Sequence, residues 1–329
     1  MRRILVTGAS GFVGTHLVER LKKGREYDVF ASVFGQSEGF ISNLLPASRV
    51  FPLNLMDAEQ TRRVVTHIKP QAVVHLAALA AAGASFDKPV ETLVNNISVQ
   101  VNLLEALVRL NSKPTILIIG SGEEYGMVRK EDLPIDEETP LRPVSPYAVS
   151  KVAQDFLGYQ YYLSYQLPVI RLRPFNHTGE RQTDQFVVPA FAKQIAEIEA
   201  GKAEGVLKVG NLQATRDFTD VKDMVIAYEL ALTQCRPGEV YNIGSGRGVS
   251  INQILRQLMA MSKVAIRVEK DRKRFRKLDV PMIVADNRRF RKATGWKLTI
   301  PLAETLTCVL DYWRGEIKKS SPSSKGSKA

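Results

Sequence analysis

A tyrosine and a lysine stand four residues apart in the segment SPYAVSK, residues 145–151. Side chains at positions i and i+4 share one face of a helix, so a helix here would bring Tyr147 and Lys151 together. The ordinary pKa of tyrosine is about 10, and a nearby ammonium group favours the deprotonated form. A hydroxyl held in this way can act as a general acid or base on a substrate oxygen. The pair could also be a simple surface contact, and only the surrounding elements decide between these interpretations.

A serine precedes this pair at a position where ligands commonly bind. Ser121 follows the apolar run 115–120, in the segment IIGSGEEYG. If that run is a parallel strand, Ser121 lies at its carboxyl end, where open α/β sheets bind their ligands. From there a hydroxyl can donate a hydrogen bond to a substrate oxygen that gains or loses charge.

The elements that must position these residues alternate along the first half of the chain. Apolar runs at 3–7, 28–33, 49–53, 72–77, 115–120 and 167–173 alternate with amphipathic stretches near 12–23, 58–68, 88–110 and 146–165. Continuous Val, Ile and Leu runs between helices are typical of a parallel sheet that is buried on both faces. The pattern predicts an α/β fold with a doubly wound parallel sheet of the Rossmann type.

A glycine-rich segment joins the first predicted strand to the first predicted helix. LVTGASGFVGTHL places Gly8, Gly11 and Gly14 there, with Phe12 and Val13 at the start of the helix. Such glycines permit a tight turn, close approach of the backbone to a pyrophosphate, and close packing of helix on strand. The free N–H groups of the helix N-terminus then face the phosphates. The segment predicts a dinucleotide site.

The GxxGxxG spacing, followed in order by Ser121, Tyr147 and Lys151, resembles the short-chain dehydrogenase/reductase superfamily. The resemblance implies that Tyr147 is the general acid or base, that Lys151 also holds the nicotinamide ribose, and that hydride passes between substrate and nicotinamide. The cofactor-binding residues that it implies are Gly8, Gly11, Phe12, Val13, Gly14, Asn54, Leu55, Ala77, Ala78, Asn96, Tyr147 and Lys151.

The choice between NAD(H) and NADP(H) stays open in the sequence. A carboxylate after the second strand would select NAD, and a basic residue there would favour NADP. Phe34 occupies this region, so neither signal is present. The missing carboxylate favours NADP(H) slightly, because nothing there would repel a 2′-phosphate.

Beyond residue 175 the pattern changes to loops and helices, the latter near 187–200, 220–233, 250–261 and 301–315. The run EVYNIGSG at 239–246 reads as a further buried strand that returns to the sheet. We expect a dinucleotide-binding domain at 1–175, with returning segments near 217–247. A nucleotide-sugar-binding domain would comprise 176–216 and 248–315, followed by a disordered basic tail at 316–329.

Several later segments resemble the GDP-mannose 4,6-dehydratase and GDP-4-keto-6-deoxymannose reductase families of the extended superfamily branch. They are RPFNHTGERQ at 173–182, FAKQI at 191–195, VGNLQATRDFTDVKD at 209–223 and FRKLDVPMIVADNRRFRKATGW at 275–296. The resemblance implies a GDP-sugar substrate. It places Asn176 and Lys193 at the sugar and pyrophosphate, Asn211 and Arg216 around the nucleotide, and Arg276 on the phosphates. Lys277 stands where these families usually have proline.

Reductase and dehydratase chemistry remain alternatives. Glu123 occupies the position of the glutamate with which dehydratases move the C5 proton, so it joins the catalytic and substrate-binding candidates with Ser121. IGSGEEYGM and RDFTDVKD resemble the reductases more closely, which favours reduction of a GDP-4-keto-6-deoxyhexose to GDP-6-deoxy-D-mannose (GDP-D-rhamnose) or its C4 epimer. A dehydratase, an epimerase, another nucleotide-sugar reductase, a heptose substrate and an inactive scaffold are the other interpretations.

Composition narrows the class of protein. Hydrophobic residues make up 44% and charged residues 24%, and no apolar run reaches the roughly 20 residues of a membrane helix. The net charge of +12 suits a polyanionic substrate, and no nucleic-acid-binding motif accompanies it. Two distant cysteines and four scattered histidines predict no disulfide and no metal site, as in a cytoplasmic enzyme. The superfamily resemblance implies a homodimer formed through the helices at 88–110 and 146–165.

Overall fold

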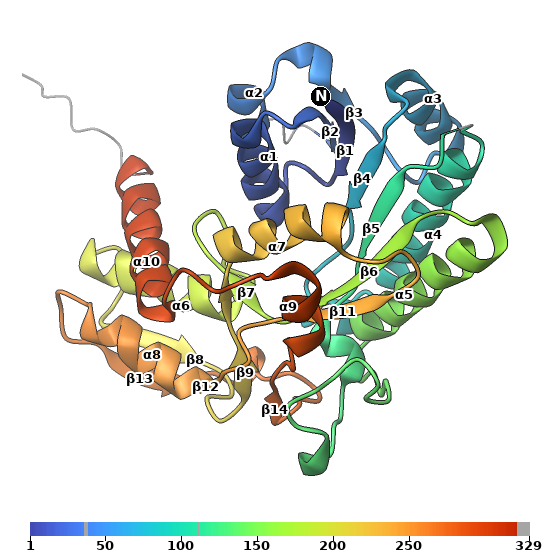
Figure 1. Ribbon diagram of the computed structural model, residues 1–329. Coiled ribbons are helices and arrows are strands. Elements are labelled where there is room, and N and C mark those ends of the chain that lie inside the picture. The colour runs from blue at the N-terminus through green and yellow to red at the C-terminus, as the bar shows by residue number, and fades with distance from the viewer. Residues whose placement is uncertain (36–38, 111, 321–329) are drawn as a thin grey trace, which may run out of the picture.

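The computed structural model describes residues 1–35, 39–110 and 112–320, and it is built around a seven-stranded parallel sheet (Figure 1). The strand order is β11-β6-β5-β4-β1-β2-β3. These strands are β1 (Arg2–Thr7), β2 (Tyr27–Val33), β3 (Val50–Pro52), β4 (Ala72–His75), β5 (Thr115–Ile119), β6 (Val169–Pro174) and β11 (Val240–Ile243). The order reverses between β1 and β4, and such a reversal opens a crevice for ligands at the carboxyl ends of the strands.

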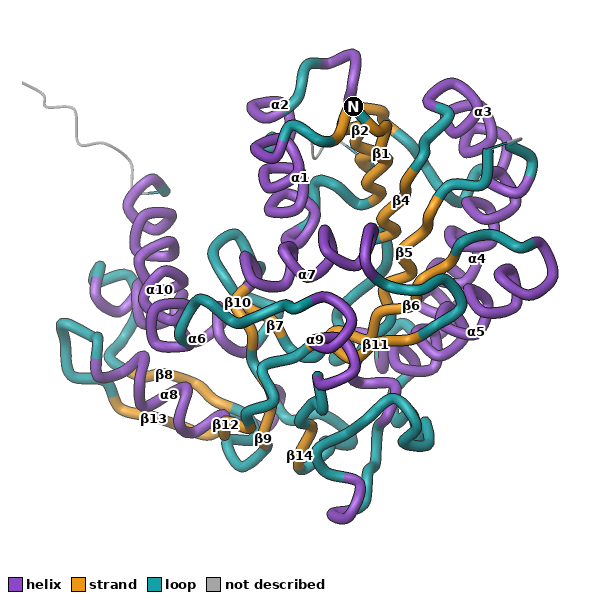
Figure 2. The backbone as a smooth tube through the Cα atoms, in the orientation of Figure 1, coloured by secondary structure: helices purple, strands orange, loops and turns teal. Residues whose placement is uncertain are grey.

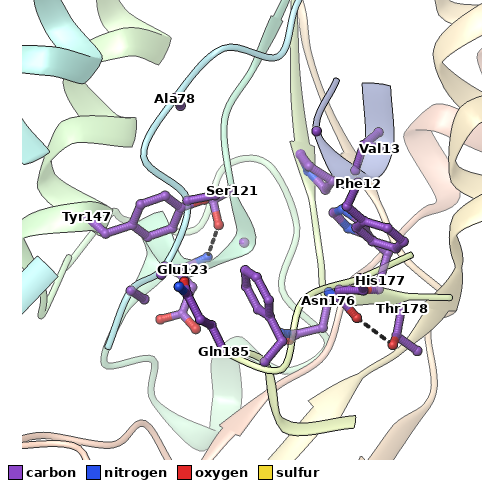
Figure 3. A pocket seen from close by; sticks show the side chains of 18 of the residues that line it. Phe12, Val13, Ala78, Ser121, Glu123, Tyr147, Asn176, His177, Thr178 and Gln185 are labelled. Atoms are coloured by element: carbon purple, nitrogen blue, oxygen red, sulfur yellow. Dashed lines mark hydrogen bonds between the residues drawn. The ribbon is translucent and has the colours of Figure 1, made fainter. Parts of the chain in front are cut away.

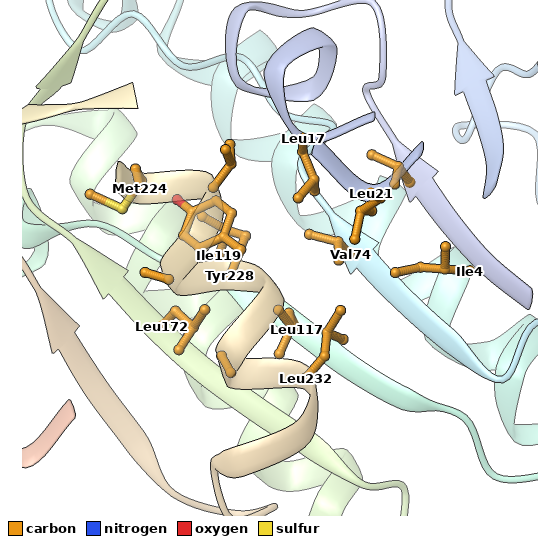
Figure 4. Close-up of a cluster of buried hydrophobic side chains, with 14 of the residues drawn as sticks. Ile4, Leu17, Leu21, Val74, Leu117, Ile119, Leu172, Met224, Tyr228 and Leu232 are labelled. Carbon is orange, nitrogen blue, oxygen red and sulfur yellow. The ribbon is translucent and has the colours of Figure 1, made fainter. Parts of the chain in front are cut away.

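Helices cover both faces of this sheet. The main ones of the first half are α1 (Phe12–Gly24), α3 (Ala58–Ile68), α4 (Pro89–Val108) and α5 (Pro146–Tyr165), with the short α2 (Ile41–Leu44). α1 packs with α7 (Val221–Gln234) on one face, and α3, α4 and α5 pack together on the other. Two hydrophobic layers therefore enclose the strands, and Figure 4 shows the layer between the sheet and α1 and α7.

The predicted doubly wound α/β fold is confirmed. Strand residues such as Leu5, Val73 and Ile116 are completely buried, because helices lie on both sides of the sheet. This two-sided burial explains why the strands read as continuous apolar runs rather than as alternating patterns. The predicted return of 239–246 to the sheet is also confirmed, since β11 pairs in parallel with β6.

A second hydrophobic core lies beside the sheet, at the lower left of Figures 1 and 2. It is formed chiefly by α6 (Val187–Glu199), α8 (Ile251–Ala260), α10 (Leu302–Lys319) and β8 (Val206–Val209). The remaining elements are α9 (Arg288–Thr294), β7 (His177–Thr178), β9 (Thr215–Asp217), β10 (Thr219–Asp220), β12 (Gly248–Ser250), β13 (Arg267–Lys270) and β14 (Met282–Ile283), together with the 3₁₀ turns η1 (Ala47–Arg49), η2 (Ala84–Phe86), η3 (Gly122–Tyr125), η4 (Lys130–Asp132) and η5 (Arg272–Arg274). The domain boundaries given above remain a prediction.

The C-terminal boundary differs from the expected one. Residues 316–319 were expected in a disordered tail, but α10 continues to Lys319. Ile317 is buried, Lys202 donates from Nζ to its carbonyl oxygen at 2.8 Å, and Lys319 pairs with Glu316. These contacts stabilise one more helical turn. The rest of the expected tail, residues 321–329, lies outside the described residues. Among the residues that the structure describes, no helix has the length and apolar character needed to cross a membrane.

Candidate active site

The glycine loop after β1 has the shape of a dinucleotide cradle. Gly8 adopts a φ of +66°, which favours glycine, and a Cβ there would meet the backbone of Ala77 at 2.8 Å. A Cβ on Gly14 would lie 2.3 Å from the carbonyl oxygen of Gly8. Gly11 is the N-cap of α1, with no side-chain cap. The loop therefore leaves the N-terminus of α1 open toward the crevice, as a bound pyrophosphate requires.

A cavity of about 600 Å³ runs from this loop to the ends of β5 and α5. Its walls include Gly8, Gly11, Phe12, Val13, Gly14, Ala78, Ser121, Glu123, Tyr147, Lys151, Asn176 and Arg276, all of them predicted from the sequence. Figure 3 shows Ser121, Glu123 and Tyr147 across the cavity from Phe12 and Val13. The residues of the glycine loop fit a dinucleotide, and the catalytic candidates lie at the far end of the same space.

Local structure sets the position of each catalytic candidate. Ser121 follows β5 and caps η3, where its hydroxyl accepts from the Glu123 backbone N–H at 3.1 Å. Tyr147 lies in the first turn of α5, which Ser145 caps by accepting from Ala148 N–H at 3.1 Å. Lys151 follows one turn later, and its Nζ donates to the Ile119 carbonyl oxygen at 2.9 Å. The structure thus brings Ser121, Tyr147 and Lys151 together, as predicted.

Burial controls the acidity of the tyrosine. Tyr147 is partly exposed as a residue, but its hydroxyl faces into the cavity, and burial raises its pKa. Hydrogen bonding with the Ser121 side chain lowers this pKa, while the charges of Glu123 and Glu124 raise it. The phenol is therefore protonated at neutral pH. The sequence predicts that Lys151, together with a bound oxidised nicotinamide, favours the phenolate; without a cofactor, burial is the largest effect on this pKa and acts in the opposite direction.

Burial also acts on the lysine. It lowers the pKa of Lys151 to about 8, and the facing Glu124 carboxyl group opposes this change. The Lys151 ammonium lies 5.9 Å from the centre of the Tyr147 ring. At neutral pH Lys151 is therefore mainly charged while Tyr147 keeps its proton, which is the state required for a proton donor.

Four predicted cofactor residues do not line this cavity as the structure has it. Ala77 packs behind Gly8, where its backbone limits the residue at position 8 to glycine. Asn96 holds the loop after β4, since it accepts from Leu79 N–H at 2.7 Å and donates to the Leu79 carbonyl oxygen at 3.1 Å. Asn54 makes local contacts at the end of β3, and Leu55 is buried against Leu53 and Val99.

A second cavity of about 270 Å³ adjoins the first and shares Asn176 and Arg276 with it. Asn211 and Arg216 line this second cavity, and both donate to the Asp279 carboxylate, at 2.8 and 2.7 Å. Arg274 and Arg276 also lie on its wall. The cluster of basic side chains suits a phosphate-bearing ligand.

Lys193 does not line either cavity. Its Nζ donates to Asp184 at 2.7 Å, and its ammonium lies 5.5 Å from the ring centre of Trp313. Asp184 itself lines the second cavity, so Lys193 stands behind it. The predicted contact of Lys193 with the sugar and pyrophosphate therefore requires a rearrangement of this ion pair.

Glu123 and Arg276 form an ion pair at the junction of the two cavities. Arg276 Nη1 lies 3.2 Å from Glu123 Oε1, although 153 residues separate them in the sequence. The Glu123 side chain is only 13% exposed, so the pair is shielded from water on one side. The catalytic candidate Glu123 and the phosphate candidate Arg276 are thus partners of each other.

Several cavity residues were missed in the sequence. They are the loop 80–84 after β4 and a segment ahead of α6 that includes Gln182, Thr183, Gln185 and Phe186, together with Phe218. Gln185, Phe186, Val187 and Phe218 belong to both cavities. The available signal was the predicted helix beginning at 187, because the free N–H groups of a helix N-terminus favour an anionic ligand.

The arrangement can protonate an oxygen beside a carbon that receives hydride. A bound nicotinamide supplies the hydride in such a site. Ser121 can donate a hydrogen bond to the substrate oxygen, and Tyr147 can give that oxygen its proton. Lys151 contributes a positive charge beside Tyr147, which stabilises the phenolate left after the transfer.

Comparison with known proteins agrees with this geometry. The sequence profile of the GDP-mannose 4,6 dehydratase family matches residues 5–308. The GDP-6-deoxy-D-mannose reductase of Pseudomonas aeruginosa is 33% identical over 97% of this chain and 99% of its own length. The GDP-6-deoxy-D-talose 4-dehydrogenase of Aggregatibacter actinomycetemcomitans is 29% identical over 89% of this chain and 91% of its own.

Solved structures show the same relationship. The structure of RMD from Pseudomonas aeruginosa complexed with NADPH has a TM-score of 0.85 and 32% identity, and the match covers 96% of this chain and 100% of that one. The UDP-glucose 4-epimerase of Thermus thermophilus in complex with NAD has a TM-score of 0.82 and 28% identity, over 95% of this chain and 99% of that one. The predicted resemblance is confirmed: the chain belongs to the GDP-mannose 4,6 dehydratase family of extended short-chain dehydrogenases/reductases, the NAD(P)-dependent oxidoreductases of nucleotide sugars.

Proposed function

We propose that the protein reduces a GDP-4-keto-6-deoxyhexose at C4, giving GDP-6-deoxy-D-mannose (GDP-D-rhamnose) or its C4 epimer. The observation that carries this proposal is the similarity to a GDP-6-deoxy-D-mannose reductase over nearly the full length of both chains. The protonated state of Tyr147 supports it, because reduction of a ketone consumes a proton at the carbonyl oxygen.

The Glu123–Arg276 ion pair favours reduction over dehydration. Dehydration across C5 and C6 needs a further carboxyl group that is free to move the C5 proton. In this structure Glu123 is held by the Arg276 guanidinium at 3.2 Å. We assign Glu123 the role of orienting Arg276, Asn176 a contact with the sugar, and Arg276 a contact with the diphosphate.

NADPH is the proposed cofactor. Within the described residues, the end of β2 offers Phe34, whose side chain is largely exposed, and no carboxylate that would repel a 2′-phosphate. The related structure with a TM-score of 0.85 holds NADPH.

The direct test is loss of nicotinamide absorbance when purified protein is mixed with NADPH or NADH and GDP-4-keto-6-deoxymannose. We expect one equivalent of NADPH to be consumed for each keto sugar, and chromatography of the product against both C4 epimers assigns its configuration. Conversion of GDP-mannose to a keto sugar without net cofactor change would instead show a dehydratase. Interconversion of C4 epimers of a UDP-sugar would show an epimerase.

Arg276→Ala is expected to weaken substrate binding more than it slows the chemical step. A charge-assisted hydrogen bond contributes about 1.5–3 kcal/mol, so KM for the GDP-sugar should rise about 10- to 100-fold, with a smaller change in kcat. Steady-state kinetics measure both constants. Arg267→Ala is the matched control, because Arg267 is exposed on β13, where it pairs with the exposed Glu269. Equal KM values for the two variants would contradict the role of Arg276.

We also propose a homodimer formed through α4 and α5. These helices pack side by side at the right of Figure 1, and they expose Val90 and Val94 on α4 and Val149, Phe156 and Leu163 on α5. The three α5 residues recur every seven positions, so they lie on one face of the helix. An exposed apolar surface of this kind is typical of an interface.

Phe156→Glu should therefore dissociate the dimer. In the dimer interface the glutamate would be buried without a partner, which is costly. In the single chain Phe156 is 54% exposed, so the substitution should leave the fold of each protomer intact. Light scattering during size-exclusion chromatography should show twice the mass of one chain for the original protein and a single chain for the variant. Val268→Glu, on β13, is expected to leave the mass unchanged. A monomeric original protein would refute the proposed interface.

A further inference from the structure

A buried glutamate lies directly beneath the catalytic residues and takes no part in the mechanism described above. Glu124 is completely buried in η3, immediately after the catalytic serine loop. A Cβ on Gly120 would lie 2.3 Å from Glu124 Oε1, so a larger residue at position 120 would displace this carboxyl group. The local backbone thus makes room for this carboxyl group next to the strand end that carries Ser121.

The carboxyl group of Glu124 holds the backbone of the catalytic serine. Oε1 accepts a hydrogen bond from Ser121 N–H at 2.7 Å, while the Ser121 hydroxyl accepts from Glu123 N–H at 3.1 Å. The two bonds close a capping box around η3. Together they set the direction of the Ser121 side chain, so a change at Glu124 would be transmitted to the substrate oxygen.

Titratable groups from two elements face the same carboxyl group. Lys151, Tyr147 and Asp155 belong to α5, and Arg173 belongs to β6. Arg173 Nε lies 3.2 Å from Glu124 Oε2, but it donates its hydrogen bond to Asp155 at 2.8 Å. Among the described residues, Oε2 therefore has no hydrogen-bond partner of its own.

Glu124 and Lys151 respond to each other's charge. Burial and the neighbouring Asp155 raise the pKa of Glu124 to about 8, against the lowering effects of Arg173 and Lys151. Burial lowers the pKa of Lys151 to about 8, and Glu124 acts in the opposite direction. Both groups therefore change charge in the same pH range, beneath the residue that donates the proton.

We propose that Glu124 is a positioning residue for the reaction: its buried carboxyl group fixes the backbone of Ser121 and, in its ionised form, supplies the negative charge that keeps the facing Lys151 side chain protonated. This role rests on the proposed function, because the reaction concerned is the keto-sugar reduction. Glu124 acts only through these two neighbours, since it does not line either cavity.

Two variants separate the two roles. Glu124→Gln keeps an oxygen that can accept from Ser121 N–H but removes the charge. Without the facing carboxylate, the pKa values of Lys151 and Tyr147 both fall, so the alkaline limb of the kcat profile should move to lower pH by about one unit. Glu124→Asp keeps the charge but is too short to hold Ser121. We expect kcat to fall on the order of 10- to 100-fold, with the limb unmoved and KM little changed.

Glu137→Gln is the matched control. Glu137 is also a buried carboxyl group, but it accepts from Asn242 N–H at 2.8 Å and pairs with Arg289, away from the triad. Loss of stability with an unmoved pH profile is expected there. If Glu124→Gln also loses stability but keeps the original pH profile, Glu124 is a structural residue and the inference is wrong.

A measurement without substrate keeps this inference separate from the proposed function. The folded protein holds a proton on Glu124 up to about pH 8, whereas an unfolded glutamate releases it near pH 4.5. The Glu124 carboxyl group therefore makes the free energy of unfolding fall as pH rises between these values. Denaturant titrations should show that the free energy of unfolding falls more steeply with rising pH in the original protein than in Glu124→Gln. If the two proteins differed by the same free energy at every pH, the charge role of Glu124 would be wrong. If the original protein does not reduce the keto sugar, the proposed function is wrong. The role of Glu124 can still be tested, by comparing the stability of the original protein and Glu124→Gln and by measuring the pH profile of the nucleotide-sugar reaction that the protein does catalyse.

Discussion

Tyr147→Phe should lower kcat for keto-sugar reduction by about 10²- to 10⁴-fold, the usual contribution of a positioned general acid. The substitution removes only the hydroxyl oxygen at the start of α5, where Ser145 continues to cap the helix. Binding of NADPH and the free energy of unfolding should therefore stay close to their original values. Stopped-flow absorbance measures the hydride step, and fluorescence titration measures cofactor binding.

Tyr165→Phe provides the matched control for the removal of a tyrosine hydroxyl. Tyr165 ends the same helix and is exposed, well away from the two cavities. Turnover of this variant should equal that of the original protein. Retention of full turnover by Tyr147→Phe would mean that another group supplies the proton, and the mechanism above would be wrong.

Asp155→Ala should reduce the free energy of unfolding by about 3–5 kcal/mol, because it leaves buried positive charges without their main partner. Asp155 is 1% exposed on α5. Its two oxygens accept from Arg171 at 2.7 Å and from Arg173 at 2.8 Å, and both arginines are buried in β6. Of these two arginines, Glu124 contacts Arg173 alone, at 3.2 Å, so it cannot replace Asp155 for both.

Chemical denaturation followed by circular dichroism measures this loss. Glu59→Ala is a suitable comparison, because Glu59 forms a similarly short ion pair with Arg62 on the exposed surface of α3. Exposed pairs contribute little to stability, so this variant should unfold at nearly the original denaturant concentration. A similarly small loss in Asp155→Ala would show that water or Glu124 compensates the two arginines.

The buried arginines also show where prediction from sequence ends. The run VIRLRP was correctly predicted as a strand, and Arg171 and Arg173 alternate along it with Ile170 and Leu172. Alternate residues of a strand face opposite sides of the sheet, so both arginines point toward the α5 side. The two arginines can be buried because Asp155 accepts their hydrogen bonds. The position of Asp155 beside β6 depends on how α5 packs on the sheet.

The sequence by itself determined the parallel sheet, the glycine loop at its first turn, and the approach of Ser121 to Tyr147 and Lys151. These features follow from patterns within a few residues: apolar runs, glycine spacing, the i to i+4 relation on a helix, and the meeting of parallel strand ends at one edge. Such patterns do not depend on distant side chains, so they can be read before the fold is known.

Only the tertiary structure decided the partners of the charged side chains. The pairing of Glu123 with Arg276, the burial of Glu124 beneath Ser121 and the contact of Lys193 with Asp184 were not expected. The charge state of Tyr147 also depended on the tertiary structure. Burial raises the pKa of Tyr147, whereas a lysine one turn away was expected to lower it. The physical reason is that burial and ion pairing depend on which surfaces pack together, and contacts such as that between residues 123 and 276 join segments that no local pattern relates.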